Sequence, residues 1–306
     1  MLTEEKFYAK ILLFGEHTLM YGSQALSIPY FERFGYFSFS ADQPNSLDSV
    51  SHLQRFSEYL EAHPQLPLDT NAFKNDIKKG LVYNTNIPLG YGLGSSGSLV
   101  AAVYSRYGTD KILKESETAQ DLKTLKQLFS EMESFFHGKS SGLDPLICYF
   151  QKSITINPDG ELSLVTGKPF HKEDRGAVFI LDSGQQGETH KMVRDFAVKC
   201  KNSDFLRRVQ EELIPATNQC IKNWISGEKE SFFNNIENLS SLTVNFLTPM
   251  VPNGFESIWK NGLENNDYYL KLCGSGGGGM ILGFTRHWAK AKELLRDYPV
   301  HLVQKI

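Results

Sequence analysis

The sequence predicts a protein of mixed helices and strands arranged in two domains. The chain has 306 residues, which is enough for two packed domains or one large one. Strand patterns and helix patterns occur in both halves of the chain. A polar, charged run at 171–175 separates the two halves. We therefore expect an N-terminal domain of residues 1–174 and a C-terminal domain of residues 175–306.

In the first half, apolar and aromatic patterns mark the elements. A run of apolar residues predicts a first strand that ends at Gly15, and apolar residues at helical spacing predict an amphipathic helix with Glu133 at the edge of its apolar stripe. The expected strands span 7–14, 24–40 (more than one strand) and 81–87, and the expected helices span 51–62 and 121–136.

The second half begins with a strand at 177–181 and then alternates helices with a pair of strands at 268–273 and 280–284. Between these two strands lies a run of glycines and one serine at 274–279. Such a run can be a flexible linker. Because a strand pattern flanks it on each side, we expect an ordered loop instead.

Composition indicates which class of partner and which cellular compartment to expect. The net charge of −3, with Lys and Arg scattered, argues against nucleic acid as the main partner and favours a small-molecule substrate. The first six residues are polar and acidic, and no apolar run reaches membrane-spanning length, so we expect a cytoplasmic protein without a membrane partner. Wide spacing disfavours a zinc site or disulfides and predicts buried thiols for Cys148, Cys200, Cys220 and Cys273.

The glycine-rich stretch 88–98 predicts a phosphate-binding loop. It runs directly into an apolar helical pattern, so its backbone N–H groups would lie at a helix N-terminus, where they favour an anion. Residues 92–97 also match the G-x-G-x-x-G string of dinucleotide-binding proteins, but 110–117 offers no second apolar strand that ends in an acidic residue. A Walker A loop is excluded, because no Gly-Lys-Ser/Thr follows the glycines.

Charged residues near these loops have two interpretations each. Glu133 and Asp144 could hold a metal and act as a base, or they could be a solvated helix-edge charge and a turn residue. Lys10 stands in an otherwise apolar strand, where it either reaches to water at a sheet edge or is buried beside a charged partner.

Three short motifs do not support other enzyme classes. Glu16-His17 lacks the second histidine of a zinc helix. The run at 182–184 resembles an aspartic-protease signature, but no second copy exists to share the proton. The Ser95-Ser96 pair does not satisfy G-x-S-x-G, which disfavours a serine hydrolase.

Taken together, these motifs resemble those of the GHMP kinase superfamily, which includes galactokinase and the homoserine, mevalonate and phosphomevalonate kinases. The resemblance covers nearly the whole chain. Between Glu133 and Asp144, the pairs His137-Gly138 and Ser141-Gly142 are similar to those of the mevalonate kinases. The three motifs, in the family's order, are residues 10–17 with 21–22, residues 92–96, and residues 271–279.

The resemblance implies a two-domain α+β fold, with an N-terminal domain like ribosomal protein S5 domain 2, a C-terminal ferredoxin-like domain and the active site between them. It implies that Asp144 is the catalytic carboxylate with Lys10 ion-paired to it, and that Ser96 and Glu133 ligate Mg²⁺. ATP phosphates would contact the two glycine loops. The implied nucleotide-binding residues are Gly90, Gly92, Leu93, Gly94, Ser95, Ser96, Gly97, Gly274, Gly276 and Gly277.

The implied activity is ATP-dependent phosphorylation of a substrate hydroxyl, with mevalonate converted to 5-phosphomevalonate in isoprenoid biosynthesis and Glu16 and His17 near the acceptor. Phosphomevalonate and homoserine kinases share the motifs and stay open as alternatives. A catalytically silent sensor and a dehydrogenase also stay open as alternative functions, and assembly as a homodimer stays open as well. The chain departs from the family at Cys273, where Thr is common, and at Ser275 and Gly97, where Ala is common. Residues 8–9 also replace the usual Ala-Pro-Gly that leads into the first strand.

Overall fold

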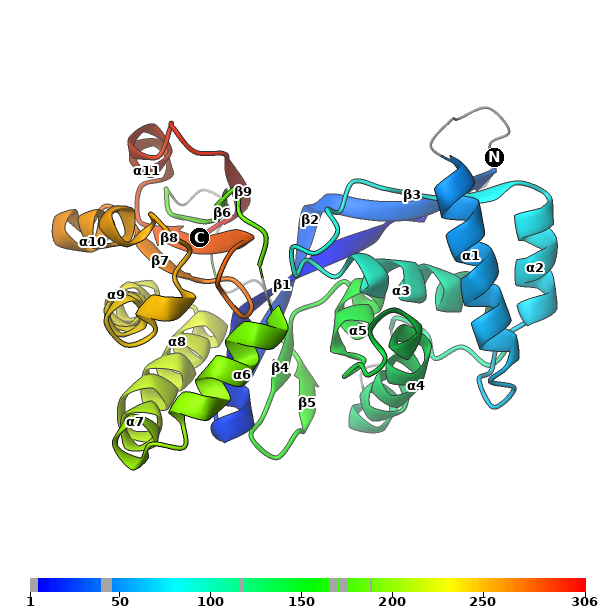
Figure 1. The fold of residues 1–306 in the computed structure, drawn as a ribbon, viewed down its shortest axis with the longest axis horizontal. Helices are drawn as coiled ribbons and strands as arrows, with labels where there is room; N and C mark the ends of the chain where they lie inside the picture. The colour runs from blue at the N-terminus through cyan, green and yellow to red at the C-terminus, as the bar shows by residue number, and fades with distance from the viewer. Residues whose placement is uncertain (1–4, 40–45, 116–117, 166–169, 171–174, 188) are drawn as a thin grey trace.

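The computed structural model describes residues 5–39, 46–115, 118–165, 170, 175–187 and 189–306, and two lobes lie side by side in it (Figure 1). The N-terminal lobe has a five-stranded sheet in which all described pairings are antiparallel. The long strand β2 pairs with β1, β3 and β4, and β4 pairs with β5. The strands are β1 Phe7–Phe14, β2 Ala25–Phe39, β3 Leu81–Thr85, β4 Ile154–Ile156 and β5 Leu162–Leu164.

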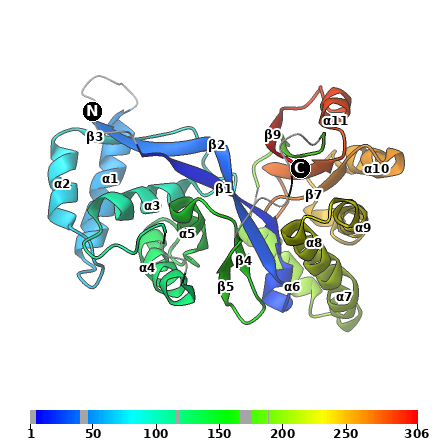
Figure 2. The same ribbon diagram turned by 180° about the vertical axis from the view of Figure 1, so that it is seen from behind.

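The helices of the N-terminal lobe gather on one side of this sheet, as the view from behind also shows (Figure 2). They are α1 Ser46–Glu61, α2 Thr70–Lys78, α3 Ser95–Tyr107, α4 Ala119–His137 and α5 Leu143–Phe150. Helix α3 packs against both α4 and α5, and its buried positions include a run of small and β-branched residues. These small residues let α3 approach its neighbours closely, which brings the start of α3 near the start of α5.

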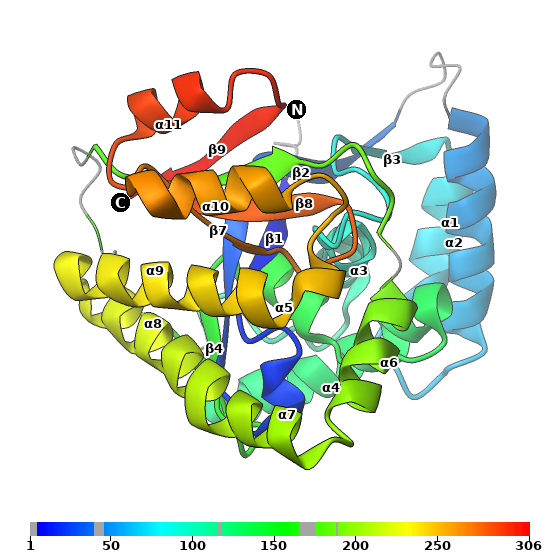
Figure 3. The ribbon, with the colours of Figure 1, turned by 60° about the vertical axis from the view of Figure 1, so that its left-hand side comes forward.

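The C-terminal lobe has a four-stranded antiparallel sheet in the order β7-β8-β6-β9, covered by helices (Figure 3). Its strands are β6 Ala177–Asp182, β7 Tyr269–Leu272, β8 Met280–Thr285 and β9 Val300–Lys305. Its α-helices are α6 Thr189–Lys199, α7 Ser203–Arg208, α8 Ile214–Ser226, α9 Lys229–Phe246, α10 Glu256–Asn265 and α11 Trp288–Leu294. Shorter helical segments are η1 Thr18–Tyr21, η2 Val209–Leu213 and η3 Thr248–Met250.

One hydrophobic core extends across both lobes. The side chains of β1 that face the C-terminal lobe share a cluster with the core residues of that lobe. Phe14 stacks on Phe284 of β8 with ring centroids 5.9 Å apart and meets Phe232 of α9 edge-on at 6.2 Å. A second cluster fills the space between the N-terminal sheet and its helices. Strand β1, together with the neighbouring part of β2, therefore joins the two lobes.

Most of the expected elements are confirmed, with shifted ends. The strands expected in 24–40 are one long strand, β2, and the helix expected at 51–62 begins earlier, at Ser46. The pair around the second glycine run is the antiparallel hairpin β7–β8, so that run is an ordered loop. The dinucleotide-binding alternative is wrong, because every pairing among the described strands is antiparallel. Residues 171–174 lie outside the described residues, so the boundary at 174/175 stays a prediction.

None of the helices in the described parts of the chain combines the length and the apolar character needed to cross a membrane. The four cysteines form no disulfide. Cys148, Cys200 and Cys220 are buried, as expected, whereas Cys273 is only half-buried.

Candidate active site

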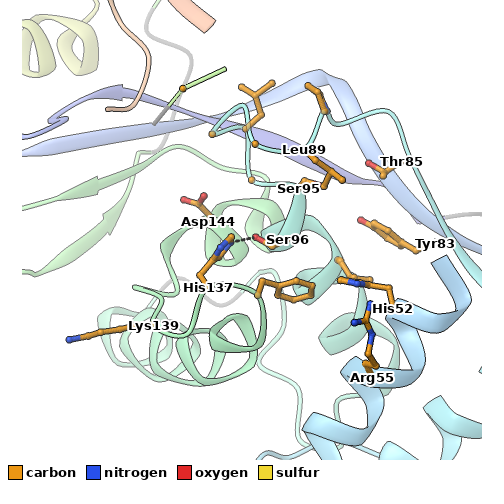
Figure 4. A pocket seen from close by; sticks show the side chains of 18 of the residues that line it. His52, Arg55, Tyr83, Thr85, Leu89, Ser95, Ser96, His137, Lys139 and Asp144 are labelled. Atoms are coloured by element: carbon orange, nitrogen blue, oxygen red, sulfur yellow. Dashed lines mark hydrogen bonds between the residues drawn. The ribbon is translucent and has the colours of Figure 1, made fainter. Parts of the chain in front are cut away.

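A cavity of about 1400 Å³ lies beside the first glycine loop (Figure 4). Its walls come from α1, β3, the loop that precedes α3, the C-terminal end of α4, the start of α5, and α6 of the other lobe. The volume exceeds the roughly 300–1,000 Å³ of a typical small-molecule site. There is room for a nucleotide and a second small molecule together.

The first glycine loop forms one wall and ends as the N-terminus of α3. Gly90, Gly92 and Gly94 have left-handed backbones, with φ of 79°, 70° and 77°. Gly94 is the N-cap of α3, and having no side chain it caps none of the first-turn N–H groups. A β-carbon on Gly90 or Gly92 would meet nothing within 4 Å, so the backbone there borders open space. A helix N-terminus of this kind attracts a phosphate.

Lys10 and Asp144 form an ion pair at the edge of this cavity. Nζ of Lys10 lies 2.9 Å from Oδ2 of Asp144, and Asp144 lines the cavity. Lys10 is only 7% exposed, so the interpretation of an edge-strand lysine that reaches to water is wrong. Burial by itself lowers the pKa of Lys10, but the charge of Asp144 and the hydrogen bond to it outweigh burial and raise that pKa. The lysine therefore stays charged beside the carboxylate.

Ser96 and Glu133 are joined directly. Oγ of Ser96 donates to Oε1 of Glu133 at 2.9 Å, and Ser140 donates to Oε2. Nε2 of His137 lies 3.0 Å from the Ser96 oxygen. Because the one hydroxyl proton of Ser96 goes to Glu133, His137 is the donor in this contact. Figure 4 shows this Ser96–His137 contact beside Asp144. The sequence indicated neither His137 nor Ser140 as a partner in this network.

Glu133 is 3% exposed, so the interpretation of a solvated helix-edge charge is wrong. Burial, followed by the negative charge of nearby Asp144, raises the pKa of Glu133 to about 7 against the lowering effect of its two serine donors. Because burial makes the ionised form of Glu133 costly, a cation close by would stabilise that form.

These oxygens fit a magnesium ion. Mg²⁺ prefers hard oxygen ligands and takes one or two from protein, with the rest from phosphates and water. Ser96 offers a hydroxyl and Glu133 a carboxylate next to the proposed phosphate site. Within the described residues, no group of three or more His, Cys, Asp and Glu side chains could hold a metal ion. The donor set thus suits an ion that arrives with a nucleotide.

Gly97 plays a packing role in this arrangement. It lies in α3 and does not line the cavity. A β-carbon there would stand 2.8 Å from both the carbonyl carbon of Asp144 and the nitrogen of Pro145. Glycine therefore allows α3 and α5 to touch, which sets the distance between the Ser96 side and the Asp144 side of the site.

The second glycine loop lies in the C-terminal lobe, between β7 and β8. Gly274, Gly276 and Gly277 all have left-handed backbones. A β-carbon on Gly276 would lie 2.5 Å from the carbonyl oxygen of Met250, and one on Gly277 would lie 2.8 Å from Sδ of Met192. None of the three glycines lines the cavity, so their contact with a nucleotide stays a prediction.

Glu16 and His17 lie in the turn after β1, also outside the cavity lining. Glu16 is ion-paired with Lys271 of β7. A ring nitrogen of His17, Nε2, is 2.9 Å from the carbonyl oxygen of Ser275, and the ring stacks on Phe196 at 4.8 Å. This turn is thus tied to the C-terminal lobe at three points.

Sequence reasoning missed the positive charge around the cavity. These side chains sit on helix surfaces and loops whose placement depends on the tertiary fold, and no local pattern marks them. They are Arg55, Lys139, Lys191 and Arg194, and Asp144 is the one acidic residue among the described residues of the lining. Lys271 was also missed, although a lysine within an apolar strand is the same signal that singled out Lys10.

The chain is similar to known proteins over most of its length. Residues 55–152 match the family model for the GHMP kinases N terminal domain. A mevalonate kinase of Archaeoglobus fulgidus is 21% identical over 280 residues, which are 90% of each chain.

Solved structures match the whole chain. A mevalonate kinase of L. major in complex with R-mevalonate has a TM-score of 0.66 and 17% identity, over 100% of this chain and 97% of that one. The phosphomevalonate kinase of Streptococcus pneumoniae has a TM-score of 0.63 and 15% identity, over 99% and 98%. This protein therefore carries a GHMP kinase N-terminal domain within a chain that has the fold of the GHMP kinases from end to end, and it resembles their mevalonate kinases.

Proposed function

We propose that this protein is an ATP-dependent kinase that transfers the γ-phosphoryl group to a hydroxyl of a small molecule, and that the molecule is mevalonate, which becomes 5-phosphomevalonate. The ion pair between Lys10 and Asp144 carries the proposal, because it sets a carboxylate and a cation beside the N-terminus of α3. In this role the protein would act in the cytoplasm, in isoprenoid biosynthesis.

Phosphoryl transfer needs in-line positioning and neutralisation of charge more than it needs covalent help from the protein. The backbone N–H groups that begin α3 bind the phosphate oxygens, and the cavity cations add positive charge around them. Ser96 and Glu133 would hold Mg²⁺, which supplies charge neutralisation to the phosphates when bound.

Asp144 accepts a hydrogen bond from the acceptor hydroxyl and takes its proton as the oxygen attacks the γ-phosphorus, while the bond from that phosphorus to the β,γ-bridging oxygen breaks and ADP leaves. Lys10 holds the Asp144 carboxylate in place through their ion pair and stabilises negative charge that develops on the acceptor oxygen. Both functions need a lysine that is charged, which the raised pKa of Lys10 ensures at neutral pH.

The test is a coupled assay of ADP release with ATP, Mg²⁺ and a panel of acceptors: mevalonate, phosphomevalonate, homoserine and galactose. We expect mevalonate to have the highest kcat/KM. Mass spectrometry of the product should find one added phosphate. A higher kcat/KM for phosphomevalonate would reassign the acceptor, and no turnover with the whole panel would favour the silent sensor.

A further inference from the structure

Lys271 is a fully buried lysine that connects the two lobes. It lies in β7 with 0% of its surface exposed, within a strand that is otherwise apolar. Its ammonium donates to Oε1 of Glu16 and, at 2.9 Å, to the carbonyl oxygen of Leu272. Because Glu16 follows β1, this pair joins the turn after β1 to the strand that leads into the second glycine loop.

Stability alone does not explain a buried pair of this kind. Replacing a buried ion pair by apolar side chains of similar volume is often neutral or stabilising. The pair instead determines the charge of Glu16. Burial raises the pKa of Glu16, and the charge and hydrogen bond of Lys271 counteract that rise. With Lys271 absent, the pKa of Glu16 would rise further and the carboxylate would take up a proton.

Two buried acceptor atoms in this turn have no partner. Among the residues that the structure describes, Oε2 of Glu16 and Nδ1 of His17 find no hydrogen-bond partner. Nε2 of His17 is 2.9 Å from the carbonyl oxygen of Ser275, an acceptor, so Nε2 carries the proton and Nδ1 of the neutral ring is a bare acceptor. Burial lowers the pKa of His17, which favours this neutral form. His17 also has a φ of 60°, a costly conformation for a residue other than glycine.

Cys273 lies within electrostatic reach of Lys10 of the first ion pair and of both members of the Glu16–Lys271 pair. Desolvation raises the pKa of the half-buried Cys273 to about 11, and its thiol experiences the charges of Lys271, Lys10 and Glu16. One lysine–carboxylate pair opens to the cavity through Asp144, and the other lies outside the cavity lining with an unsatisfied carboxylate oxygen. The groups that face Glu16 are Lys271, the thiols of Cys273 and Cys220, and its neighbour His17.

We propose that Lys271 is a positioning residue for the acceptor substrate. It holds Glu16 ionised and oriented, so that Oε2 accepts a hydrogen bond from the acceptor while Asp144 receives the reacting hydroxyl. The inference rests on the proposed kinase function. It predicts that loss of Lys271 weakens binding of the acceptor far more than binding of ATP, because neither Glu16 nor Lys271 lines the cavity wall that the first glycine loop forms.

The experiment measures KM for mevalonate and for ATP between pH 6 and pH 9 in the wild-type protein and in three variants. Lys271→Met should raise the mevalonate KM about 10- to 100-fold at pH 7, the range for losing a hydrogen bond to a charged group. The ATP KM should change less than about twofold, well below that range. As pH rises and Glu16 ionises without its cation, the mevalonate KM of this variant should fall back toward the wild-type value.

The double variant Lys271→Met/Glu16→Gln removes both charges, so it should fold as well as the wild type by thermal unfolding. Its mevalonate KM should stay high at every pH, because no carboxylate remains to ionise. Lys290→Met is the matched control. Lys290 is an exposed lysine of α11 paired with Asp267 in the same lobe, and its loss should leave both KM values unchanged.

If folded Lys271→Met keeps the wild-type KM for mevalonate, the inference is overturned and the proposed function stands. If Lys271→Met does not fold, the same result in the double variant has the same meaning. Equal increases in the KM of ATP and of mevalonate would also overturn it, since a general structural defect acts on both. Wild-type protein that phosphorylates no acceptor would overturn the proposed function, and the inference with it.

Discussion

Gly97 lies against the backbone of Asp144, so that a β-carbon on Gly97 would stand 2.8 Å from the Asp144 carbonyl carbon. Real β-carbons do not approach this closely. The contact is between helices α3 and α5, and it lies next to Ser96, which immediately precedes Gly97. The separation between the proposed metal ligand and the proposed base is thus set by the absence of one methyl group.

Gly97→Ala should therefore push α5 away from α3 and lower kcat while leaving ATP affinity nearly unchanged. Overpacking of this kind costs about 1–3 kcal/mol of folding free energy. Thermal unfolding, nucleotide titration and steady-state kinetics would separate the three effects. The control is Gly160→Ala. Gly160 lies in the turn between β4 and β5 with a φ of 85° and open space around it, so this variant should lose stability without losing kcat. A variant at Gly97 with wild-type kcat would show that the spacing of α3 and α5 does not govern turnover.

Asp144→Asn should keep the fold and near-normal ATP affinity but lower kcat by roughly two to four orders of magnitude, the range for losing a positioned general base. Asparagine has nearly the same shape and can still accept a hydrogen bond from Lys10 at the 2.9 Å contact. Measurement of kcat together with nucleotide Kd on folded protein checks this. Retention of more than about a tenth of wild-type turnover would contradict the assignment of Asp144 as the base.

Lys10→Met should also reduce turnover, by about 3 kcal/mol of barrier if the ammonium stabilises developing charge as an oxyanion-type donor does. Because the two side chains form one pair, the double variant Lys10→Met/Asp144→Asn should be little slower than Asp144→Asn alone. The measured quantity is kcat in all three variants. Fully additive losses would mean that Lys10 and Asp144 act independently.

Ser96→Ala and Glu133→Gln should each raise the Mg²⁺ concentration that gives half-maximal rate, since each removes a proposed oxygen ligand. The two effects should not add, because both residues would bind one ion and are hydrogen-bonded to each other. A Mg²⁺ titration of the rate checks this, with Ser141→Ala as the control. Ser141 is exposed, and its hydroxyl accepts a long hydrogen bond of 3.4 Å from the backbone N–H of Leu143. Unchanged Mg²⁺ dependence in both variants would return Ser96 and Glu133 to a purely structural role.

Periodicity predicted the elements well but not the environment of the charged residues. The strand with Lys10 and the helix with Glu133 form where their apolar patterns indicate. Whether these charges are buried depends on what covers them. Glu133 stands at the edge of the apolar stripe of α4, and it is buried because Ser96 of α3 and Ser140 after α4 close over it. A stripe on one helix carries no information about such neighbours.

The resemblance to a family located the site more closely than local patterns did. It paired Lys10 with Asp144 and Ser96 with Glu133, and the geometry brings both pairs together. It did not indicate the cations of α1 and α6 around the cavity, because these residues lie outside the three motifs. The packing role of Gly97 was also hidden, since contact between two helices cannot be read from either one alone.

The sharing of β1 between the two lobes has a consequence for how the protein unfolds. Strand β1 hydrogen-bonds into the N-terminal sheet, while Phe14 at its end is packed on Phe232 and Phe284 of the C-terminal lobe. Neither lobe can melt without exposing apolar surface of the other. The protein should therefore lose its structure in a single cooperative transition, and a nucleotide bound at the start of α3 should protect amides in both halves from hydrogen exchange.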